Sequence, residues 1–270
     1  MAKENKVKIK NKSKSNVNCK KSKTIYTGCN MPDEKLIITV ISNKGGVGKT
    51  SIAIAFSMYC AEKIGEKTLL LELDSSPGDF GSLFDIGTDK TLELALKFPK
   101  KYKKYVKNIY KNLDVLKGIP DPLIAEGIKK GAICELLERI CGDYKFIIAD
   151  SQTVINGMLI DVLKISNTIF VVSDYCLESI SRISNLIDVL VNKFSISKSS
   201  VKIIINKKRL FCFLRCGDIS KIIDFPIEAF ISLDRKFDKS VFLFNKRKIF
   251  GTRFFKDASK ALDGYKHNWS

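Results

Sequence analysis

The residues best suited to chemistry form the run Ser42-Asn43-Lys44-Gly45-Gly46-Val47-Gly48-Lys49-Thr50. A glycine-rich turn allows consecutive backbone N–H groups to face one phosphate, and Asn43 tolerates left-handed backbone angles at the first position of the turn. Lys49 then neutralises β- and γ-phosphate charge, while the Thr50 hydroxyl is placed to bind Mg²⁺. The run predicts a nucleoside triphosphate site with these contacts: Gly45, Gly46, Val47, Gly48, Lys49, Thr50 and Ser51.

Such a loop needs a strand before it and a helix after it. The preceding residues 36–41 are a continuous apolar, largely β-branched run, as expected for a strand buried on both faces. The following residues carry an apolar stripe that is typical of a core-facing helix: Ile52, Ala55, Phe56, Tyr59 and Cys60. The positive end of that helix dipole would add to the attraction for phosphate.

Further short apolar runs predict strands at residues 68–73, 145–149, 168–173 and 201–205, with weaker signals at 112–116 and 227–232. Helical patterns alternate with several of them. The expected fold class is therefore α/β, a mostly parallel sheet with helices on both faces in three layers. We expect a basic disordered tail over residues 1–34 and one domain over residues 35–266.

The composition narrows the possible settings. With 270 residues and 45% hydrophobic content the chain is long enough for a large core, and no apolar run is long enough to span a membrane. We expect a cytoplasmic protein whose eight cysteines, without a C-x-x-C pair, are reduced. The net charge of +18 favours a polyanionic partner such as nucleic acid or an acidic membrane surface, although a lysine-rich genome composition would explain it equally.

Lysines and tyrosines alternate between residues 97 and 111. Two interpretations remain open: these lysines contact phosphates, or the stretch is a solvated helix with its tyrosines packed inward.

A second lysine, Lys44, precedes Lys49 by five residues. The run from Lys44 to Thr50 resembles the deviant Walker A motif of the ParA/MinD family of P-loop ATPases. The resemblance implies that two subunits enclose two ATP molecules as a homodimer, and that Lys44 reaches the phosphates of the partner subunit. It also implies ATP and Mg²⁺ as ligands.

The resemblance continues over most of residues 35–265 and implies roles for two aspartates. Asp74 closes a run similar to the family's second strand and would orient the attacking water, although Glu72 stands where the family has a first aspartate. Asp150 closes a run similar to the Walker B strand and would hold Mg²⁺ through water. After it, Ser151-Gln152-Thr153 replaces the family's Thr-Pro-Pro type turn.

By the same resemblance, Asn206 corresponds to the strand-end asparagine that reads the adenine edge, and residues 225–234 border the base. An amide suits this role because it both donates and accepts hydrogen bonds. Residues 74–83 look most similar to the CpaE/TadZ branch of the family.

The function implied is an ATP-dependent dimerisation switch, a slow ATPase that acts in DNA partition or in the placement of a pilus, secretion or cell-surface assembly. One alternative is an iron-sulfur or redox carrier related to the nitrogenase iron protein, for which Cys212 and Cys216 are the only close cysteine pair. The other is an ATP-binding scaffold without turnover.

The expected partners are a second copy of the chain and an unidentified protein cargo or activator. Non-specific DNA contact is expected through Lys207, Lys208 and Arg209. A membrane anchor is not expected, because the apolar stripe of residues 254–262 suits the domain's own last helix.

Overall fold

The computed structural model describes residues 35–264 with gaps at 76–77, 210–214, 224 and 243–244, so the basic tail and the C-terminal residues 265–270 lie outside it. The described chain forms one eight-stranded sheet in the order β3-β4-β2-β5-β1-β6-β7-β8, and every pair is parallel except β3 with β4. The strands are β1 (Leu36–Ile41), β2 (Thr68–Glu72), β3 (Lys107–Tyr110), β4 (Leu113–Leu116), β5 (Phe146–Asp150), β6 (Thr168–Asp174), β7 (Val201–Lys208) and β8 (Ile227–Ser232).

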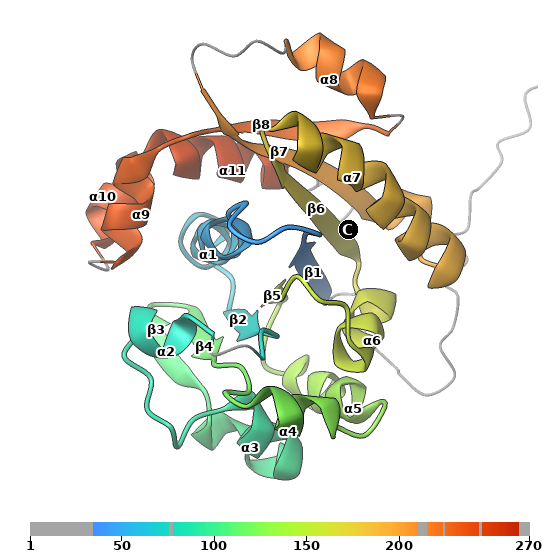
Figure 1. Ribbon diagram of the computed structural model, residues 1–270. Coiled ribbons are helices and arrows are strands. Elements are labelled where there is room, and N and C mark those ends of the chain that lie inside the picture. Colours follow the sequence, from blue (N-terminus) through green and yellow to red (C-terminus); the bar gives the residue numbers. More distant parts are fainter. Residues whose placement is uncertain (1–34, 76–77, 210–214, 224, 243–244, 265–270) are drawn as a thin grey trace, which may run out of the picture.

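Helices cover both faces of this sheet (Figure 1). Alternate strand residues point to opposite sides, so Ile37 belongs to one apolar cluster and Ile38 to the other. The described helices are α1 (Lys49–Tyr59), α2 (Phe80–Leu83), α3 (Leu92–Lys97), α4 (Pro122–Glu126), α5 (Ala132–Ile140), α6 (Gly157–Ile165), α7 (Leu177–Asp188), α8 (Cys216–Ile222), α9 (Arg235–Phe242), α10 (Lys246–Gly251) and α11 (Arg253–Asp263), with shorter turns at Cys60–Ile64, Pro99–Lys104, Val189–Lys193 and Lys198–Ser200.

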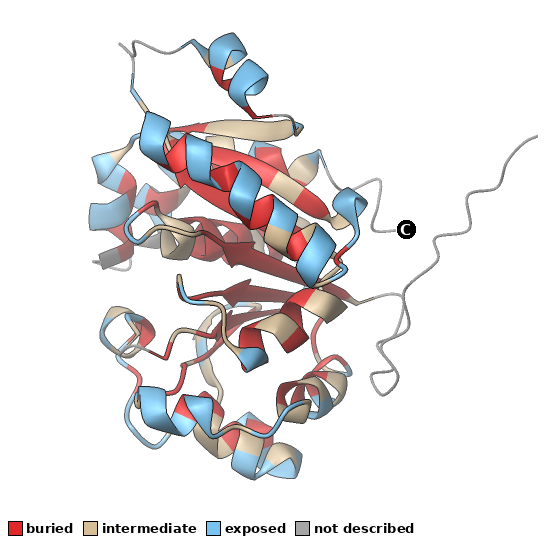
Figure 2. Ribbon diagram, turned by 45° about the vertical axis from the view of Figure 1, so that its right-hand side comes forward, coloured by how far each residue is buried: buried red, intermediate tan, exposed pale blue. Residues whose placement is uncertain are grey.

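The two clusters define three layers. α1, α9, α10 and α11 pack on one face, and α3, α5, α6 and α7 pack on the other. Figure 2 shows the strands buried between the helices, while α7 turns an exposed stripe outward. The predicted α/β fold class is therefore confirmed, and each predicted strand is present within a few residues of its expected ends.

The prediction of a solvated helix over residues 97–111 is wrong. The chain forms a 3₁₀ turn over Pro99–Lys104 and then the edge strand β3. Only Tyr102 is deeply buried in the turn, and β3 pairs with β4 across a short connection. Antiparallel pairing with β4 gives the backbone of residues 107–110 hydrogen-bond partners. A lone solvated helix over the same residues would have no face packed against the rest of the fold.

The last described helix, α11, has the packed apolar stripe that its sequence predicted. Phe254, Phe255, Ala258 and Leu262 are buried against α1 and β8. Within the described ranges, none of the helices has the length and apolar content required to cross a bilayer.

Candidate functional site

The phosphate loop connects β1 to α1 at the carboxyl edge of the sheet, where the strands β5 and β6 also end. Two of its glycines have left-handed backbone angles, Gly46 with φ of 72° and Gly48 with φ of 97°. A Cβ atom on Gly48 would lie 2.3 Å from the Asn206 side chain, so this position excludes other residues for two reasons. Gly45 and Asn43 do not have positive φ, so the turn does not use the tolerance of Asn43 for left-handed angles.

The N-terminus of α1 is open to an anion. Gly48 caps the helix without a side-chain hydrogen bond, and the first turn contains no acidic residue. The first backbone N–H groups of an α-helix have no partner within the helix, and the helix dipole adds positive potential there. This geometry suits a phosphate group.

Lys49 lies between the phosphate loop and the loop that follows β5. Its Nζ donates to Ser42 Oγ at 3.1 Å and to Thr153 Oγ1 at 3.4 Å. Burial lowers the pKa of Lys49, while Asp150 and Asp74 act in the opposite direction. The ammonium group therefore lies near both predicted acidic residues.

Thr50 and Asp150 form a pair at the start of α1. Thr50 Oγ1 donates to Asp150 Oδ2 at 2.8 Å, whereas the other carboxylate oxygen, Oδ1, is buried without a hydrogen-bond partner. Burial raises the pKa of Asp150 to about 7, although the Thr50 hydrogen bond lowers it. A hydroxyl beside a carboxylate with an unsatisfied oxygen fits the oxygen ligands and bound water that Mg²⁺ prefers.

Glu72 is placed to organise the backbone rather than to face a ligand. It is 2% exposed and accepts hydrogen bonds from Phe80 N at 3.0 Å and from Gly118 N at 2.8 Å. Glycine is required at two neighbouring positions, since a Cβ on Gly78 would lie 2.2 Å from Glu72 and one on Gly118 would lie 2.4 Å from the Asp74 carbonyl oxygen. Glu72, which stands where the family resemblance implies an aspartate, thus joins the segment after β2 to the segment after β4.

Asp74 follows β2 and is half-buried. The backbone N–H before it, that of Leu73, donates to Asp150 O at 2.8 Å. The next residue, Ser75, is bonded to Gln152, whose Oε1 accepts from Ser75 N at 3.3 Å and from Ser75 Oγ at 2.7 Å. Nothing in the local pattern of Ser151-Gln152-Thr153 indicates this contact, because its two partners are 77 residues apart in the chain.

Lys44 contacts the connection between β6 and α7. Its Nζ donates to Ser179 Oγ at 2.9 Å and forms an ion pair with Asp174 Oδ2 at 3.4 Å. Its side chain is 30% exposed. Lys44 is therefore held by its own chain on the side of the loop away from Thr153.

Asn206, at the end of the predicted strand, packs on the phosphate loop. Its Nδ2 donates to Val47 O at 2.8 Å and its Oδ1 accepts from Lys207 N at 2.7 Å. Both polar groups of the amide thus have partners within the chain, and Gly48 lies against the same side chain.

Lys207 and Lys208, which are predicted to contact DNA, have partners in the fold. Lys207 has a left-handed backbone with φ of 60° and donates to Gly46 O. Lys208 Nζ lies 3.2 Å from Cys216 Sγ and 5.5 Å from the centre of the Phe230 ring. Arg209 is exposed. Cys212 lies outside the described residues, so the cysteine pair considered for an iron-sulfur carrier is not defined.

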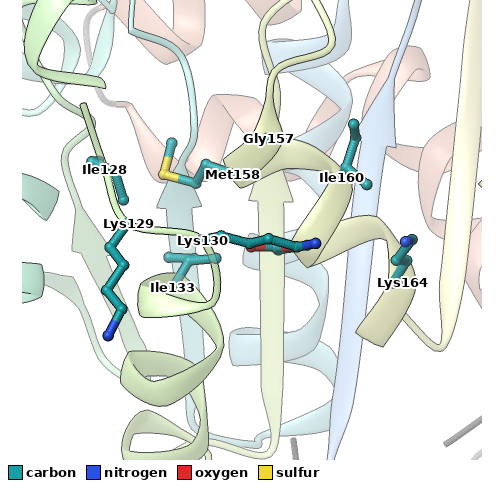
Figure 3. Close-up of a pocket in the computed structure, with 9 residues that line it drawn as sticks. Ile128, Lys129, Lys130, Ile133, Gly157, Met158, Ile160 and Lys164 are labelled. Carbon is teal, nitrogen blue, oxygen red and sulfur yellow. The ribbon is translucent and has the colours of Figure 1, made fainter. Parts of the chain in front are cut away.

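A separate cavity of about 300 Å³ lies beside α5 and α6 (Figure 3). Ile133 and Met158 supply apolar lining, and Lys129, Lys130 and Lys164 supply positive charge. None of its lining residues belongs to the predicted nucleotide site.

Comparison with known proteins identifies the family to which the chain belongs. A family model described as an AAA domain matches residues 35–203. An uncharacterized ATP-binding protein of Methanocaldococcus jannaschii is 29% identical over 141 residues, which are 51% of this chain and 52% of that protein. A second uncharacterized protein of the same organism is 29% identical over 167 residues, 57% of this chain and 64% of that protein. The chain thus spans about half to two thirds of the length of these curated relatives.

Solved structures share the fold. A ParA family ATPase from Chlorobium tepidum has a TM-score of 0.75 at 20% identity, with 84% of this chain and 99% of that chain covered. The septum site-determining protein MinD from Pyrococcus horikoshii, complexed with Mg-ADP, has a TM-score of 0.73 at 17% identity, with 86% and 96% covered. A putative plasmid partition protein from Borrelia burgdorferi, bound to AMPPNP, has a TM-score of 0.70 at 18% identity, with 87% and 99% covered.

Proposed function

We propose that this chain, which belongs to the AAA domain family and shares the fold of ParA and MinD ATPases, is a P-loop ATPase of the ParA/MinD type that acts as an ATP-dependent dimerisation switch with slow ATP hydrolysis. The observation that carries the proposal is the phosphate loop itself. Its two left-handed glycines precede an α1 N-terminus that has no side-chain cap, and the Thr50–Asp150 pair lies at that terminus. Together these groups form one site for phosphate and a hard divalent cation.

In this proposal the loop residues 45–51 hold the phosphates of ATP. Lys49 exchanges its hydrogen bonds to Ser42 and Thr153 for phosphate oxygens, which are stronger acceptors. Thr50 and, through water, Asp150 would hold Mg²⁺, which neutralises phosphate charge when it is bound. Asp74 orients the attacking water, and the remaining barrier is lowered by positioning and charge neutralisation.

Dimerisation is assigned to Lys44. In the ATP-bound state Lys44 leaves Ser179 and Asp174 and extends to the phosphates of the partner subunit. A triphosphate carries more negative charge near that lysine than a diphosphate does, so the ATP state favours the dimer and hydrolysis releases it. Such a switch serves intracellular positioning, either of DNA or of a secretion or cell-surface assembly.

Asn206 is proposed as the adenine contact. Since its amide is bonded to Val47 and Lys207, base recognition requires the side chain to turn or to share those bonds. The proposed ATPase unit is the domain of residues 35–266, and the proposed partners are a second copy, a protein cargo or activator, and non-specific DNA.

The first test is Lys49→Ala, compared with Lys101→Ala, an exposed lysine outside the site. Loss of two charge-assisted hydrogen bonds of about 1.5 kcal/mol or more each should weaken ATP binding by at least about 100-fold. Equilibrium binding of a fluorescent ATP analogue measures this, and phosphate release from the unchanged chain measures hydrolysis. Equal binding by both variants would reject the site. Binding without phosphate release would indicate the scaffold without turnover.

A further inference from the structure

We propose that Gln152 is a positioning residue that fixes Asp74 relative to the magnesium and phosphate site. This inference rests on the proposed hydrolysis but assigns a role to a side chain that stands where relatives have a proline-containing turn. The role is to tie the segment after β2 to the segment after β5 through Ser75.

The contact is buried and specific. Gln152 is 8% exposed and Ser75 is 6% exposed. A single acceptor, Gln152 Oε1, receives the Ser75 hydroxyl at 2.7 Å and the Ser75 backbone N–H at 3.3 Å. Polar groups at this depth need a partner, because an unsatisfied donor away from water is costly. The pair is therefore retained in the folded state and constrains the backbone directly after Asp74.

The residue before Asp74 is tied to the same stretch. Leu73 N donates to Asp150 O at 2.8 Å, so Asp74 lies between two connections to residues 150–152. The first connection is a backbone bond that most sequences would form. The second is a side-chain contact that depends on Gln152.

The start of α2 is held by contacts that do not involve Gln152. Glu72 accepts from Phe80 N at 3.0 Å and from Gly118 N at 2.8 Å, which fixes the start of α2. A change at Gln152 should therefore move the neighbourhood of Asp74 without releasing the start of α2.

Residues 150–153 also contact the phosphate loop at two points. Thr50 Oγ1 donates to Asp150 Oδ2 at 2.8 Å, and Lys49 Nζ donates to Thr153 Oγ1 at 3.4 Å. Gln152 thus lies between the residues that meet the nucleotide and the residue that would orient water. When Lys49 turns from Thr153 to phosphate, the shift of this stretch reaches Asp74 through the Gln152–Ser75 contact.

The test uses Gln152→Leu, Ser75→Ala and their combination, with Ser259→Ala as a control whose hydroxyl bonds within α11. Gln152→Leu keeps the size of the side chain but removes the acceptor, so kcat should fall about 10- to 100-fold, as expected when a reacting group is misplaced. Ser75→Ala keeps the hydrogen bond from the Ser75 backbone N–H and should lower kcat less than Gln152→Leu does. The combination should match Gln152→Leu, because the second change removes a contact that is already absent.

ATP affinity should stay within about threefold of the unchanged chain in every variant, since none of the changed side chains meets phosphate. Ser75→Thr, which keeps the hydroxyl that Ser75→Ala removes, should retain the kcat of the unchanged chain. An unchanged kcat in Gln152→Leu, or single effects that multiply in the combination, would overturn the proposal. A kcat and an affinity that fall together would do so as well, because a general structural role predicts that result.

Hydrogen exchange provides a second measurement that does not depend on turnover. Without nucleotide, the Ser75 amide should exchange at least about tenfold faster in Gln152→Leu than in the unchanged chain, because its acceptor is gone. Equal exchange would show that the tie does not exist in solution. If the unchanged chain binds ATP but releases no phosphate, hydrolysis is rejected while this measurement still decides the tie.

Discussion

Replacement of Glu72 by Gln tests the buried clamp between the segments after β2 and β4. Burial raises the pKa of Glu72 to about 7, and the nearby Asp74 and Asp79 add to the rise, whereas hydrogen bonds from Gly118 and Phe80 lower it. Gln fills the same space but has one acceptor and cannot ionise. It should therefore remove the pH dependence due to Glu72, together with one backbone hydrogen bond.

The sign follows from proton uptake. The folded chain holds a proton on Glu72 up to about pH 7, whereas the unfolded chain releases it near the ordinary value of 4.5. The stability that this group contributes is complete below pH 4.5 and is lost as the pH rises towards 7. A difference of this size corresponds to about 3 kcal/mol in the free energy of unfolding.

The stability of Glu72→Gln relative to the unchanged chain should therefore rise by about 3 kcal/mol between pH 4.5 and pH 8. The lost hydrogen bond subtracts about 1–3 kcal/mol at every pH, so the variant should be less stable than the unchanged chain in acid and between equally stable and about 2 kcal/mol more stable above pH 7. Urea unfolding followed by circular dichroism at several pH values measures both quantities. Glu126→Gln, at an exposed position, serves as the control. A stability difference that does not change with pH would refute the reasoning.

Three further predictions concern the proposed switch. Lys44→Ala should bind ATP within about threefold of the unchanged chain but fail to dimerise with ATP and Mg²⁺ in sedimentation, and an equally dimeric variant would contradict the role of Lys44. Asp74→Ala should retain ATP and lose at least about 100-fold in phosphate release, and a normal rate would assign the water to another residue. Replacement of Lys207, Lys208 and Arg209 by Ala should lower the salt dependence of DNA binding by up to about three in log–log slope, measured on chains that begin at residue 33. No ATP-dependent DNA binding at low salt would instead favour assembly positioning.

The sequence predicted the sheet well because its central strands are buried on both faces. Residues 36–41 are apolar except for Thr39, and residues 69–71 are all leucine; such runs identify strands of a parallel sheet without any knowledge of their neighbours. The stretch 97–111 has no such run. Its lysines and tyrosines fit an amphipathic helix, but the pairing of β3 with β4 decided its structure, and pairing depends on register rather than on local pattern.

The local geometry of the candidate site could be predicted to a similar extent and for similar reasons. The phosphate loop is local, so its glycines and Lys49 could be read from consecutive residues, and Thr50 next to Asp150 follows from the neighbouring positions of β1 and β5. Ser75 and Gln152 are 77 residues apart, and only the register of β2 with β5 brings them together. The role of Glu72 likewise depends on two backbone groups from other segments.

In the proposed switch, the position of Lys44 would make dimerisation depend on a triphosphate. Its ammonium group is paired with Asp174, whose other carboxylate oxygen is buried without a hydrogen-bond partner. Withdrawal of Lys44 would leave that carboxylate less compensated, at a cost in free energy that a neutral or weakly charged partner surface could not offset. A γ-phosphate presents more charge than one carboxylate and accepts several hydrogen bonds, so it can compete for the lysine. In the proposed switch, the Asp174–Lys44 pair would therefore keep the subunits apart until ATP is bound.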